Sequence, residues 1–468
     1  MSEATEVIPC PVRRHAARRP EVLAVVAPEE AWTWADLDRA VTAWAGHLLG
    51  LAPPSTRVAA RAETTPRFVA LVLAALRTGH VIVPFSPRLP EPAVKEHLDR
   101  IACEATLDLD DGPRTTDDGR RTTDHGQLPS IPLARPATVV FTSGSTGAPK
   151  GALLTAGNHV WSAQGWAERL PLGPGDRWLL DLPLNHVGGL AVVYRCALAG
   201  AAVAIPAPKT PTAEALRALG ATHASLVATQ LYRLLRDGDG PLPALRALLL
   251  GGSAVPAGLL DEAHARGLPV VTSYGLTEMA STVTATAPGA PREDLATSGR
   301  LLPHRDLRVR GGEIEVRGPT RFAGYLEGGR LAAPFDADGW FATGDLGHLD
   351  EAGRLVVVGR RDDRFVSGGE NVQPEAVEAA LLALPGVARA VVVPVADAEF
   401  GARPAAFVAM EGGGAPDGAA LAASLRARGL PGYLVPVAFL PWPEGEGDLK
   451  PGRAALRERA THLVAKGD

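Results

Sequence analysis

Short apolar runs alternate with longer amphipathic stretches over the first 300 residues of the chain. Seven runs are rich in valine, leucine and isoleucine, as buried strands are, and lie at residues 22–26, 81–83, 139–142, 178–181, 202–205, 248–250 and 270–272. Four stretches between them have the composition of helices and lie at residues 68–77, 213–219, 230–236 and 257–266. Strands that alternate with helices predict an α/β domain with mostly parallel sheets.

The pattern changes after Gly299. Three short strands between glycine-rich turns predict a small antiparallel subregion at residues 307–310, 313–317 and 354–359. A smaller unit follows, with expected helices at 374–384 and 419–428, expected strands at 390–395 and 405–409, and a polar tail rich in glycine and proline. We predict a large N-terminal α/β domain, residues 1–359, and a small mobile α+β C-terminal domain, residues 360–468.

A polar heptad occurs twice in succession before the run at residues 139–142. Residues 114–120 have the sequence RTTDDGR and residues 121–127 the sequence RTTDHGQ. Two polar copies cannot bury a common face, so this is no solenoid repeat. We interpret the segment as a solvated surface loop.

Composition narrows the class of protein. The chain has 468 residues, 46% of them hydrophobic, and a net charge of -5, which excludes wholesale disorder and argues against a nucleic-acid or membrane-surface partner. Three widely spaced cysteines give neither a metal pattern nor a disulfide framework. We see no secretory signal and no uncharged apolar run of about 18 residues, so we expect a cytoplasmic location and no integral membrane segment.

Lysine is scarce in this chain. Only five lysines stand against 42 arginines, namely Lys95, Lys150, Lys209, Lys450 and Lys466. The strong preference for arginine fits a nucleotide-composition bias. The two cations differ at a tight site, so each surviving lysine is a candidate for chemistry that arginine cannot perform.

The clearest chemical signal is the sequence FTSGSTGAPKG at residues 141–151, directly after an apolar run. Glycines and small hydroxyl residues let backbone N–H groups approach an anion, and Lys150 adds a positive charge. The segment therefore suits a polyphosphate. It is not the Walker pattern, because the GK[ST] ending is absent.

This segment closely resembles the phosphate loop of the adenylate-forming superfamily of acyl-CoA synthetases, luciferases and adenylation domains. Four further segments follow in that family's order, at residues 251–254, 273–278, 343–345 and 359–363. The resemblance implies that Tyr274 packs on adenine, Thr277 contacts the α-phosphate, Glu278 ligates Mg²⁺ and Asp345 binds the ribose with Arg360. The implied ATP-binding set is Thr142, Ser143, Gly144, Ser145, Thr146, Gly147, Lys150, Gly251, Gly252, Ser253, Tyr274, Gly275, Thr277, Asp345 and Arg360.

The C-terminal end carries a second lysine signal. Residues 447–453, GDLKPGR, align with the family's GKxxR ending, although Leu449 replaces the usual glycine. Negative charge builds up when a carboxylate attacks the α-phosphate, and a lysine that reaches both groups stabilises it. The resemblance thus implies that Lys450 is catalytic, together with Lys150, Thr277 and Glu278, and that Asp362 is the hinge about which the small domain rotates.

Two local signatures indicate the acid. Two segments resemble those of o-succinylbenzoate–CoA ligases: residues 366–372 with 374–375, and residues 183–190. Asn185 and Gly188 depart from the pattern of the segment at 183–190. The resemblance implies a substrate pocket with His186, Thr229 and Ser253. The acid carries a second, aromatic carboxylate, and we consider that Arg195, alone among apolar neighbours, binds it. Pairing with a protein carboxylate stays open for Arg195, and a core role stays open for His186.

The implied enzyme is an AMP-forming acid–thiol ligase that uses ATP, Mg²⁺ and coenzyme A. It would convert 2-succinylbenzoate to its CoA thioester in menaquinone biosynthesis. Three alternatives stay open: another aryl- or fatty acyl-CoA ligase, a stand-alone adenylation enzyme that loads a carrier protein, and a catalytically dead scaffold member. The expected partners are small molecules, and the sequence leaves a homo-oligomer open.

Overall fold

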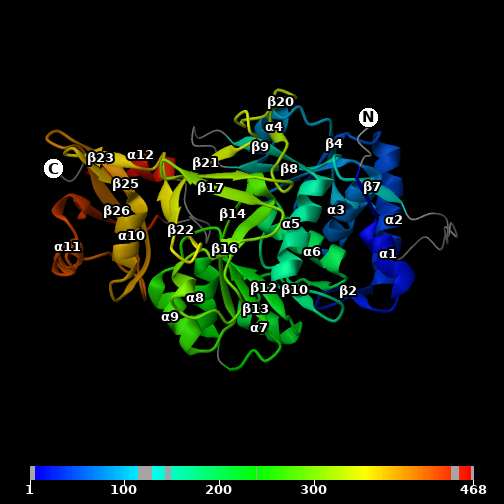
Figure 1. The fold of residues 1–468 in the computed structure, drawn as a ribbon, viewed down its shortest axis with the longest axis horizontal. Coiled ribbons are helices and arrows are strands. Elements are labelled where there is room, and N and C mark those ends of the chain that lie inside the picture. The colour runs from blue at the N-terminus through cyan, green and yellow to red at the C-terminus, as the bar shows by residue number, and fades with distance from the viewer. Residues whose placement is uncertain (1–5, 114–128, 143–148, 239, 444–452, 465–468) are drawn as a thin grey trace. The chain divides into compact units, whose positions relative to one another are not determined.

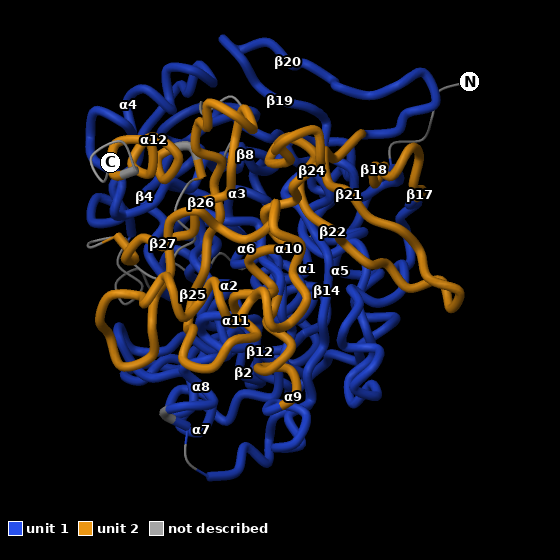
Figure 2. The backbone as a smooth tube through the Cα atoms, turned by 90° about the vertical axis from the view of Figure 1, so that its left-hand side faces the viewer, with its two compact units in different colours: residues 1–254, 262–307, 316–341 blue, residues 255–261, 308–315, 342–468 orange. Residues whose placement is uncertain are grey.

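The chain divides into two compact units, coloured separately in Figure 2. A computed structural model describes residues 6–113, 129–142, 149–238, 240–443 and 453–464. The larger unit contains residues 1–254, 262–307 and 316–341, and the smaller contains residues 255–261, 308–315 and 342–468. The smaller unit therefore consists mainly of the C-terminal third of the chain, with two short segments from earlier in the sequence.

A nine-stranded sheet forms one half of the larger unit. Its strand order is β16 (Arg300–Leu301), β15 (Ser281–Ala285), β14 (Val270–Leu276), β13 (Ala247–Leu250), β12 (His223–Leu226), β10 (Arg177–Leu179), β11 (Ala202–Ala204), β2 (Leu23–Val26) and β3 (Ala31–Thr33). The central pairs, from β14 to β2, are parallel, whereas β15, β16 and β3 pair antiparallel at the edges. The central strands are almost wholly buried, which explains their continuous apolar runs.

A seven-stranded sheet forms the other half. Its order is β20 (Arg330–Ala332), β19 (Gly324–Glu327), β9 (Lys150–Thr155), β8 (Pro136–Thr142), β5 (Val81–Phe85), β4 (Arg57–Arg61) and β6 (Ala105–Leu107). The strands β6, β4, β5 and β8 run parallel, and β8, β9, β19 and β20 pair antiparallel. A separate two-stranded sheet joins β1 (Val7–Pro9) to β7 (Ser130–Pro132).

Helices link these strands (Figure 1). They are α1 (Pro11–Arg18), α2 (Trp34–Leu51), α3 (Pro66–Thr78), α4 (Glu91–Arg100), α5 (Ala156–Arg169), α6 (Val187–Ala199), α7 (Thr212–Ala218), α8 (Ala228–Asp237) and α9 (Ala257–Ala265). Short 3-10 turns lie at Leu109–Asp111, Thr277–Met279 and Asp294–Ala296. The helix α3 shows how local sequence sets the bounds. The Thr65 side chain caps its start, Pro66 occupies the first turn, and Gly79 ends it at φ 89°.

The smaller unit contains three sheets. The strands β17 (Asp306–Arg310), β18 (Glu313–Arg317), β21 (Phe341–Leu349) and β22 (Leu355–Arg360) form the first, and the division between the units crosses β17 and β18. A hairpin joins β23 (Phe365–Ser367) to β24 (Glu370–Val372). The third sheet contains β25 (Val387–Asp397), β26 (Gly401–Met410) and β27 (Ala438–Pro441), with helices α10 (Pro374–Leu382), α11 (Gly418–Ala427) and α12 (Arg453–Val464) and a 3-10 turn at Gly432–Leu434.

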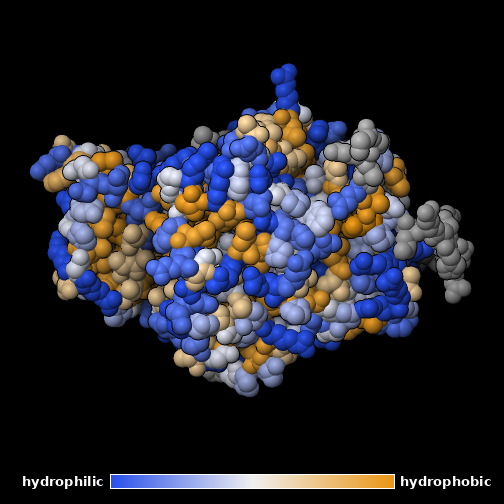
Figure 3. Space-filling model, in the orientation of Figure 1, coloured by the Kyte–Doolittle hydropathy of each residue, from blue (hydrophilic) through white to orange (hydrophobic). Residues whose placement is uncertain are grey.

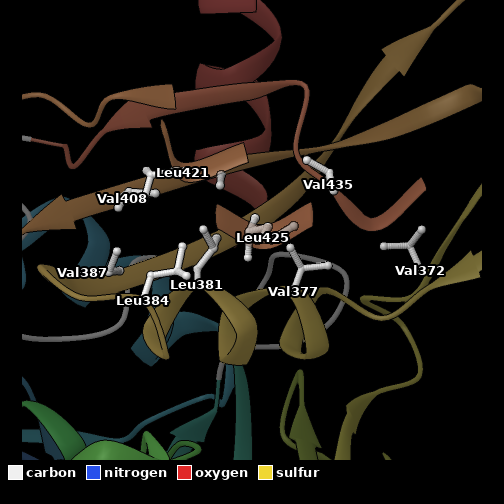
Figure 4. Close-up of a cluster of buried hydrophobic side chains, with 11 residues drawn as sticks. Val372, Val377, Leu381, Leu384, Val387, Val408, Leu421, Leu425 and Val435 are labelled. Carbon is white, nitrogen blue, oxygen red and sulfur yellow. The ribbon is translucent and has the colours of Figure 1, made fainter. Parts of the chain in front are cut away.

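Alternating side chains give this third sheet two apolar faces. On one face Val392 and Val408 pack with residues of α10 and α11, including Leu381 and Leu425 (Figure 4). On the other face Val391, Val393 and Phe407 pack with Leu456 and Ala460 of α12. Successive residues of a strand point to opposite faces, so the Val391–Val393 run can supply both cores.

The predicted elements compare well with the observed ones. The predicted fold class is confirmed: parallel strands form the centre of the nine-stranded sheet and one half of the seven-stranded sheet, and a smaller α+β unit follows. The polar C-terminal tail, to which no element was assigned, contains β27 and α12. The apolar stretch around Arg195, to which no element was assigned, is the helix α6. The heptad repeat lies outside the described residues.

Polar and apolar residues are intermixed over the face shown in Figure 3. The exposed large hydrophobic side chains include Leu49, Val358 and Val366, which come from different elements. No helix within the described ranges combines the length and the apolar character needed to cross a bilayer.

Two buried histidines predict that acid destabilises the fold. Burial lowers the pKa of His159 to about 3, and burial together with the charge of Arg14 lowers that of His15 to about 4. An imidazole in the unfolded chain titrates near pH 6.5, so below that pH the unfolded state binds more protons. The stabilisation is complete above pH 6.5, and each histidine should lose about a kcal/mol per pH unit below it.

Urea unfolding between pH 7.5 and 4.5 measures this loss. His159→Gln should make the free energy of unfolding less sensitive to pH, whereas His462→Gln, at an exposed position, should leave the slope unchanged. The same slope in the wild type and the His159 variant would contradict the assignment.

Candidate active site

The phosphate-loop segment connects two strands of one hairpin. The strands β8 and β9 pair antiparallel, with Thr142 opposite Lys150. Both residues are half-buried at the end of the seven-stranded sheet. The predicted loop residues Ser143, Gly144, Ser145, Thr146 and Gly147 lie outside the described residues, so the structure shows only the two strand ends that hold them.

Tyr325 lies between Lys150 and Glu278 and contacts both. The Lys150 Nζ atom is 5.3 Å from the centre of the Tyr325 ring. The Tyr325 hydroxyl donates a hydrogen bond to Glu278 Oε1 over 2.5 Å. The strand β19 brings Tyr325 here by pairing with β9. The structure thus links two predicted site residues through a third, Tyr325, which the motifs did not reveal.

The segment with Tyr274 and Glu278 turns sharply at the end of β14. A bulge lies between Tyr274 and Gly275, and a 3-10 turn holds Thr277 and Glu278. A side chain at Gly275 would have its Cβ 2.3 Å from the Ser281 carbonyl oxygen, so only glycine fits there. The half-buried carboxylate of Glu278 therefore occupies a fixed place beside Tyr325.

The segment that the motifs assign to the adenine pocket follows the neighbouring strand. Gly251, Gly252 and Ser253 come directly after β13, which runs parallel to β14. Parallel strands place their carboxyl ends at one edge of the sheet, where ligands bind in open α/β folds. The segment and Tyr274 thus lie at the same edge, and Ser253 is exposed there.

Two of the predicted acid-pocket residues offer polar groups. His186 is the N-cap residue of α6, and desolvation lowers the pKa of its imidazole. The Thr229 hydroxyl oxygen is buried without a hydrogen-bond partner in the described part of the chain. Its neighbour Gln230 uses its amide on the backbone of Val227 and Asp181. Thr229, rather than Gln230, is therefore available to a ligand.

Arg195 is a buried cation on α6. Its residue is 2% exposed, and its guanidinium carbon lies 4.5 Å from the ring centre of Trp166 and 5.1 Å from that of Trp178. Burial lowers its pKa to about 9, which still leaves it charged at neutral pH. Within the described ranges it forms no salt bridge, and its Nε atom has no hydrogen-bond partner. The alternative of a protein carboxylate as its partner finds no support there.

Arg195 also contacts the strand beside the Tyr274–Glu278 turn. Its Nη2 atom donates to Thr282 Oγ1 over 3.1 Å. Thr282 lies on β15, directly opposite Gly275 in the pairing with β14. The buried cation is thus one strand away from the segment that the motifs assign to the nucleotide.

The predicted ribose-binding pair lies in the smaller unit. Asp345 on β21 is opposite Arg360 on β22, and the Arg360 guanidinium donates to the Asp345 carboxylate over 2.9 Å. Arg360 also donates to the Thr343 carbonyl oxygen. A carboxylate held in this way is a ready acceptor for hydroxyl groups.

The two adjacent aspartates after Arg360 differ in their contacts. Asp363 pairs with Arg453 over 2.9 Å, and the same guanidinium binds Glu375 and Glu378 over 2.9 and 2.6 Å. Within the described residues Asp362 has only longer pairs, 4.0 Å to Arg360 and 3.7 Å to Arg361. The predicted hinge residue is thus the less constrained of the two.

The described residues leave two site predictions untested, the catalytic role of Lys450 and the binding of magnesium. Lys450 lies outside the described residues. No group of three or more histidine, cysteine or acidic side chains in the described ranges is arranged to hold a metal ion. A magnesium ion with Glu278 as ligand would therefore take its other ligands from phosphate oxygens and water, as this cation commonly does.

Comparisons with known proteins identify the family of this chain. The sequence matches the AMP-binding enzyme family over residues 12–326 and the AMP-binding enzyme C-terminal domain over residues 376–444. It is 37% identical to 2-succinylbenzoate–CoA ligase from Escherichia coli over 403 residues, which cover 85% of this chain and 87% of the relative.

Two solved structures of o-succinylbenzoate CoA synthetase (MenE) from Bacillus subtilis are also similar, each at 28% identity. The structure in complex with the acyl-adenylate intermediate OSB-AMP has a TM-score of 0.85 and covers 97% of this chain and 98% of its own. The structure in complex with ATP and magnesium ion has a TM-score of 0.84 and covers 97% and 99%.

Proposed function

Because this chain belongs to the AMP-binding enzyme family, we propose that it is an ATP-dependent ligase that joins 2-succinylbenzoate to coenzyme A. The observation that carries this proposal is the similarity over 85% of the chain to a 2-succinylbenzoate–CoA ligase. The products are 2-succinylbenzoyl-CoA, AMP and diphosphate, and the reaction belongs to menaquinone biosynthesis. The enzyme works in the cytoplasm, where ATP and coenzyme A are available.

The reaction has two halves at one carbonyl carbon. A carboxylate oxygen of the acid attacks the α-phosphorus of ATP, and diphosphate leaves. The thiol sulfur of coenzyme A then attacks the carbonyl carbon of the acyl-adenylate, and AMP leaves. Negative charge builds up around the α-phosphate in the first half, so fixed cations and N–H donors lower its barrier. Lys450 and Lys150 supply the two ammonium groups.

Three groups of residues hold the nucleotide. Thr142 and Lys150 carry the phosphate segment at their strand ends, and Thr277 contacts the α-phosphate from the turn after β14. Gly251, Gly252, Ser253, Tyr274 and Gly275 line the adenine pocket. The ribose hydroxyls bind Asp345, with Arg360 as its charged partner.

Glu278 fits a magnesium ligand. Its carboxylate is a hard oxygen donor, and the hydrogen bond from Tyr325 holds one of its oxygens in place. When bound, the ion would neutralise part of the phosphate charge. Tyr325 orients the carboxylate for that purpose, and its ring keeps the Lys150 ammonium close by.

The acid binds through its ring carboxylate and its keto chain. Arg195 is charged and buried, and pairing with the ring carboxylate would compensate it. The Thr229 hydroxyl, which lacks a partner in the described ranges, donates to an oxygen of the acid. His186 and Ser253 complete the polar contacts of this pocket.

We propose that the chain has two domains, residues 1–359 and 360–468, and that the second rotates about Asp362 between the two half-reactions. Asp362→Pro is expected to leave adenylate formation within about twofold of the wild-type rate and to slow thioester formation by at least about tenfold. Proline fixes φ and so prevents the rotation that the second half-reaction requires. Single-turnover measurements of diphosphate release and of thioester formation separate the two steps.

Asp362→Asn is the matched control for this experiment. It removes the charge but keeps the backbone free, so both half-reactions should proceed nearly as in the wild type. An equal loss of both half-reactions in the proline variant would refute the hinge.

A diphosphate-release assay with several acids tests the function itself. We expect 2-succinylbenzoate to be strongly preferred over benzoate and medium-chain fatty acids, with coenzyme A as the acceptor. A preference for another acid would indicate a different acyl-CoA ligase. Adenylate formation without transfer to coenzyme A would indicate a carrier-protein loader, and no release with any acid would indicate an inactive member.

A further inference from the structure

Neighbours from three elements restrain the Arg195 guanidinium. Trp166 of α5 and Trp178 of β10 lie against its face, and the Thr282 hydroxyl of β15 accepts a hydrogen bond from Nη2. The indoles limit the tilt of the guanidinium plane. They do not fix rotation within that plane, because an aromatic face attracts a cation without a directional bond. The hydrogen bond to Thr282 supplies the direction.

Thr282 also receives a second buried guanidinium. Its carbonyl oxygen accepts a hydrogen bond from Arg305 Nε over 2.7 Å. Arg305 is 5% exposed and donates further to the carbonyl oxygens of Pro303 and Ser162 and to the Ser162 hydroxyl. Its donors are thus satisfied by neutral oxygens, and it fixes the backbone of β15 at Thr282.

The two guanidinium groups differ in how many of their N–H donors have hydrogen-bond partners. Arg305 makes four hydrogen bonds, whereas Arg195 makes one and keeps a buried Nε without a partner in the described part of the chain. Neither forms a salt bridge there. Two neighbouring buried cations that form no salt bridge in the described ranges favour binding of an anion, and Arg195 is the one with donors to spare.

We propose that Thr282 is a positioning residue that aims the Arg195 guanidinium at the ring carboxylate and so makes the enzyme prefer a dicarboxylic acid. This inference rests on the proposed function, in which Arg195 binds that carboxylate. Because Thr282 lies opposite Gly275, the same strand pairing holds the aimed cation at a fixed offset from the nucleotide segment. In this proposal that offset matches the distance between the two carboxylates of the acid.

Thr282→Val tests this role, because valine keeps the shape and removes the hydroxyl acceptor. The KM for 2-succinylbenzoate should rise about tenfold, as expected for a lost hydrogen bond to a charged group. The KM for the same keto acid without its ring carboxylate, and the KM for ATP, should stay within about twofold. Thr282→Ser, which restores a hydroxyl, should restore the KM for the diacid.

Thr284→Val is the matched control. Thr284 is buried two residues along β15, and its hydroxyl donates to the Ser298 carbonyl oxygen rather than contacting Arg195. This variant should change neither KM. Comparing Thr282→Ala with Thr282→Ser gives the same test if the valine variant does not fold.

Several outcomes separate this inference from the proposed function. An equal rise in KM for both acids in Thr282→Val would mean a merely structural role and would overturn the inference. It is also overturned if the variant keeps the wild-type preference for the diacid while Arg195→Met loses it. Failure of the wild type to activate 2-succinylbenzoate would instead refute the proposed function.

Discussion

Lys450→Arg is expected to lower the rate of adenylate formation by about 10²- to 10³-fold, although the substitution conserves the charge. A compact ammonium can approach an acid oxygen and a phosphate oxygen together, whereas a planar guanidinium is wider and points its donors in fixed directions. The chain uses arginine almost everywhere else, with only five lysines in 468 residues. Diphosphate release with 2-succinylbenzoate measures the loss.

The control for this substitution is Lys209→Arg, at an exposed position between β11 and α7. It should change no rate. Thioester formation from preformed acyl-adenylate should also survive in Lys450→Arg, because we propose that Lys450 acts in the first half-reaction. Wild-type diphosphate release by the Lys450 variant would remove this residue from the mechanism.

Arg195→Met is expected to raise the KM for 2-succinylbenzoate by about a hundredfold, since in the proposed site it would leave the ring carboxylate without a charged partner. The KM for the acid without its ring carboxylate should change little. Initial rates with the two acids at saturating ATP measure the difference. Equal effects on both acids would refute the pairing.

Thermal unfolding checks that the effect of Arg195→Met is not a loss of fold. The wild-type guanidinium is buried without a salt bridge in the described ranges, and burial lowers its pKa to about 9. A buried charge of this kind opposes folding, and methionine fills a similar volume. The melting temperature of the variant should therefore not fall, and a clear fall would mean that Arg195 has a structural role.

Sequence patterns predicted the parallel strands of both sheets, because strands buried on both faces are continuously apolar. They missed α6, whose residues are buried almost all round, so no polar face marks its period. They also missed α12, which follows a segment rich in glycine and proline. In both cases tertiary packing, rather than local pattern, determines the element.

The family is confirmed, because short motifs in a fixed order carry it. The residue contacts within the site were less predictable. Tyr325 reaches Glu278 only because β19 pairs with β9, and Thr282 reaches Arg195 only because β15 lies beside β14. Such contacts arise from strand pairing between segments that are distant in the sequence, so the spacing of residues within a motif does not predict them. The individual site roles and the boundary at residue 360 stay predictions.

The hairpin of β8 and β9 has a consequence for how this protein can adapt. The two strands pair from Pro136 and Thr155 to Thr142 and Lys150, and both are buried along most of their length. Their register therefore depends on the strands and not on the seven residues that join them. Changes in the length of that connection cost little in loop-closure entropy, which grows slowly with the number of residues in a loop. The connection can thus vary in length among related sequences while the pairing of the two strands stays the same.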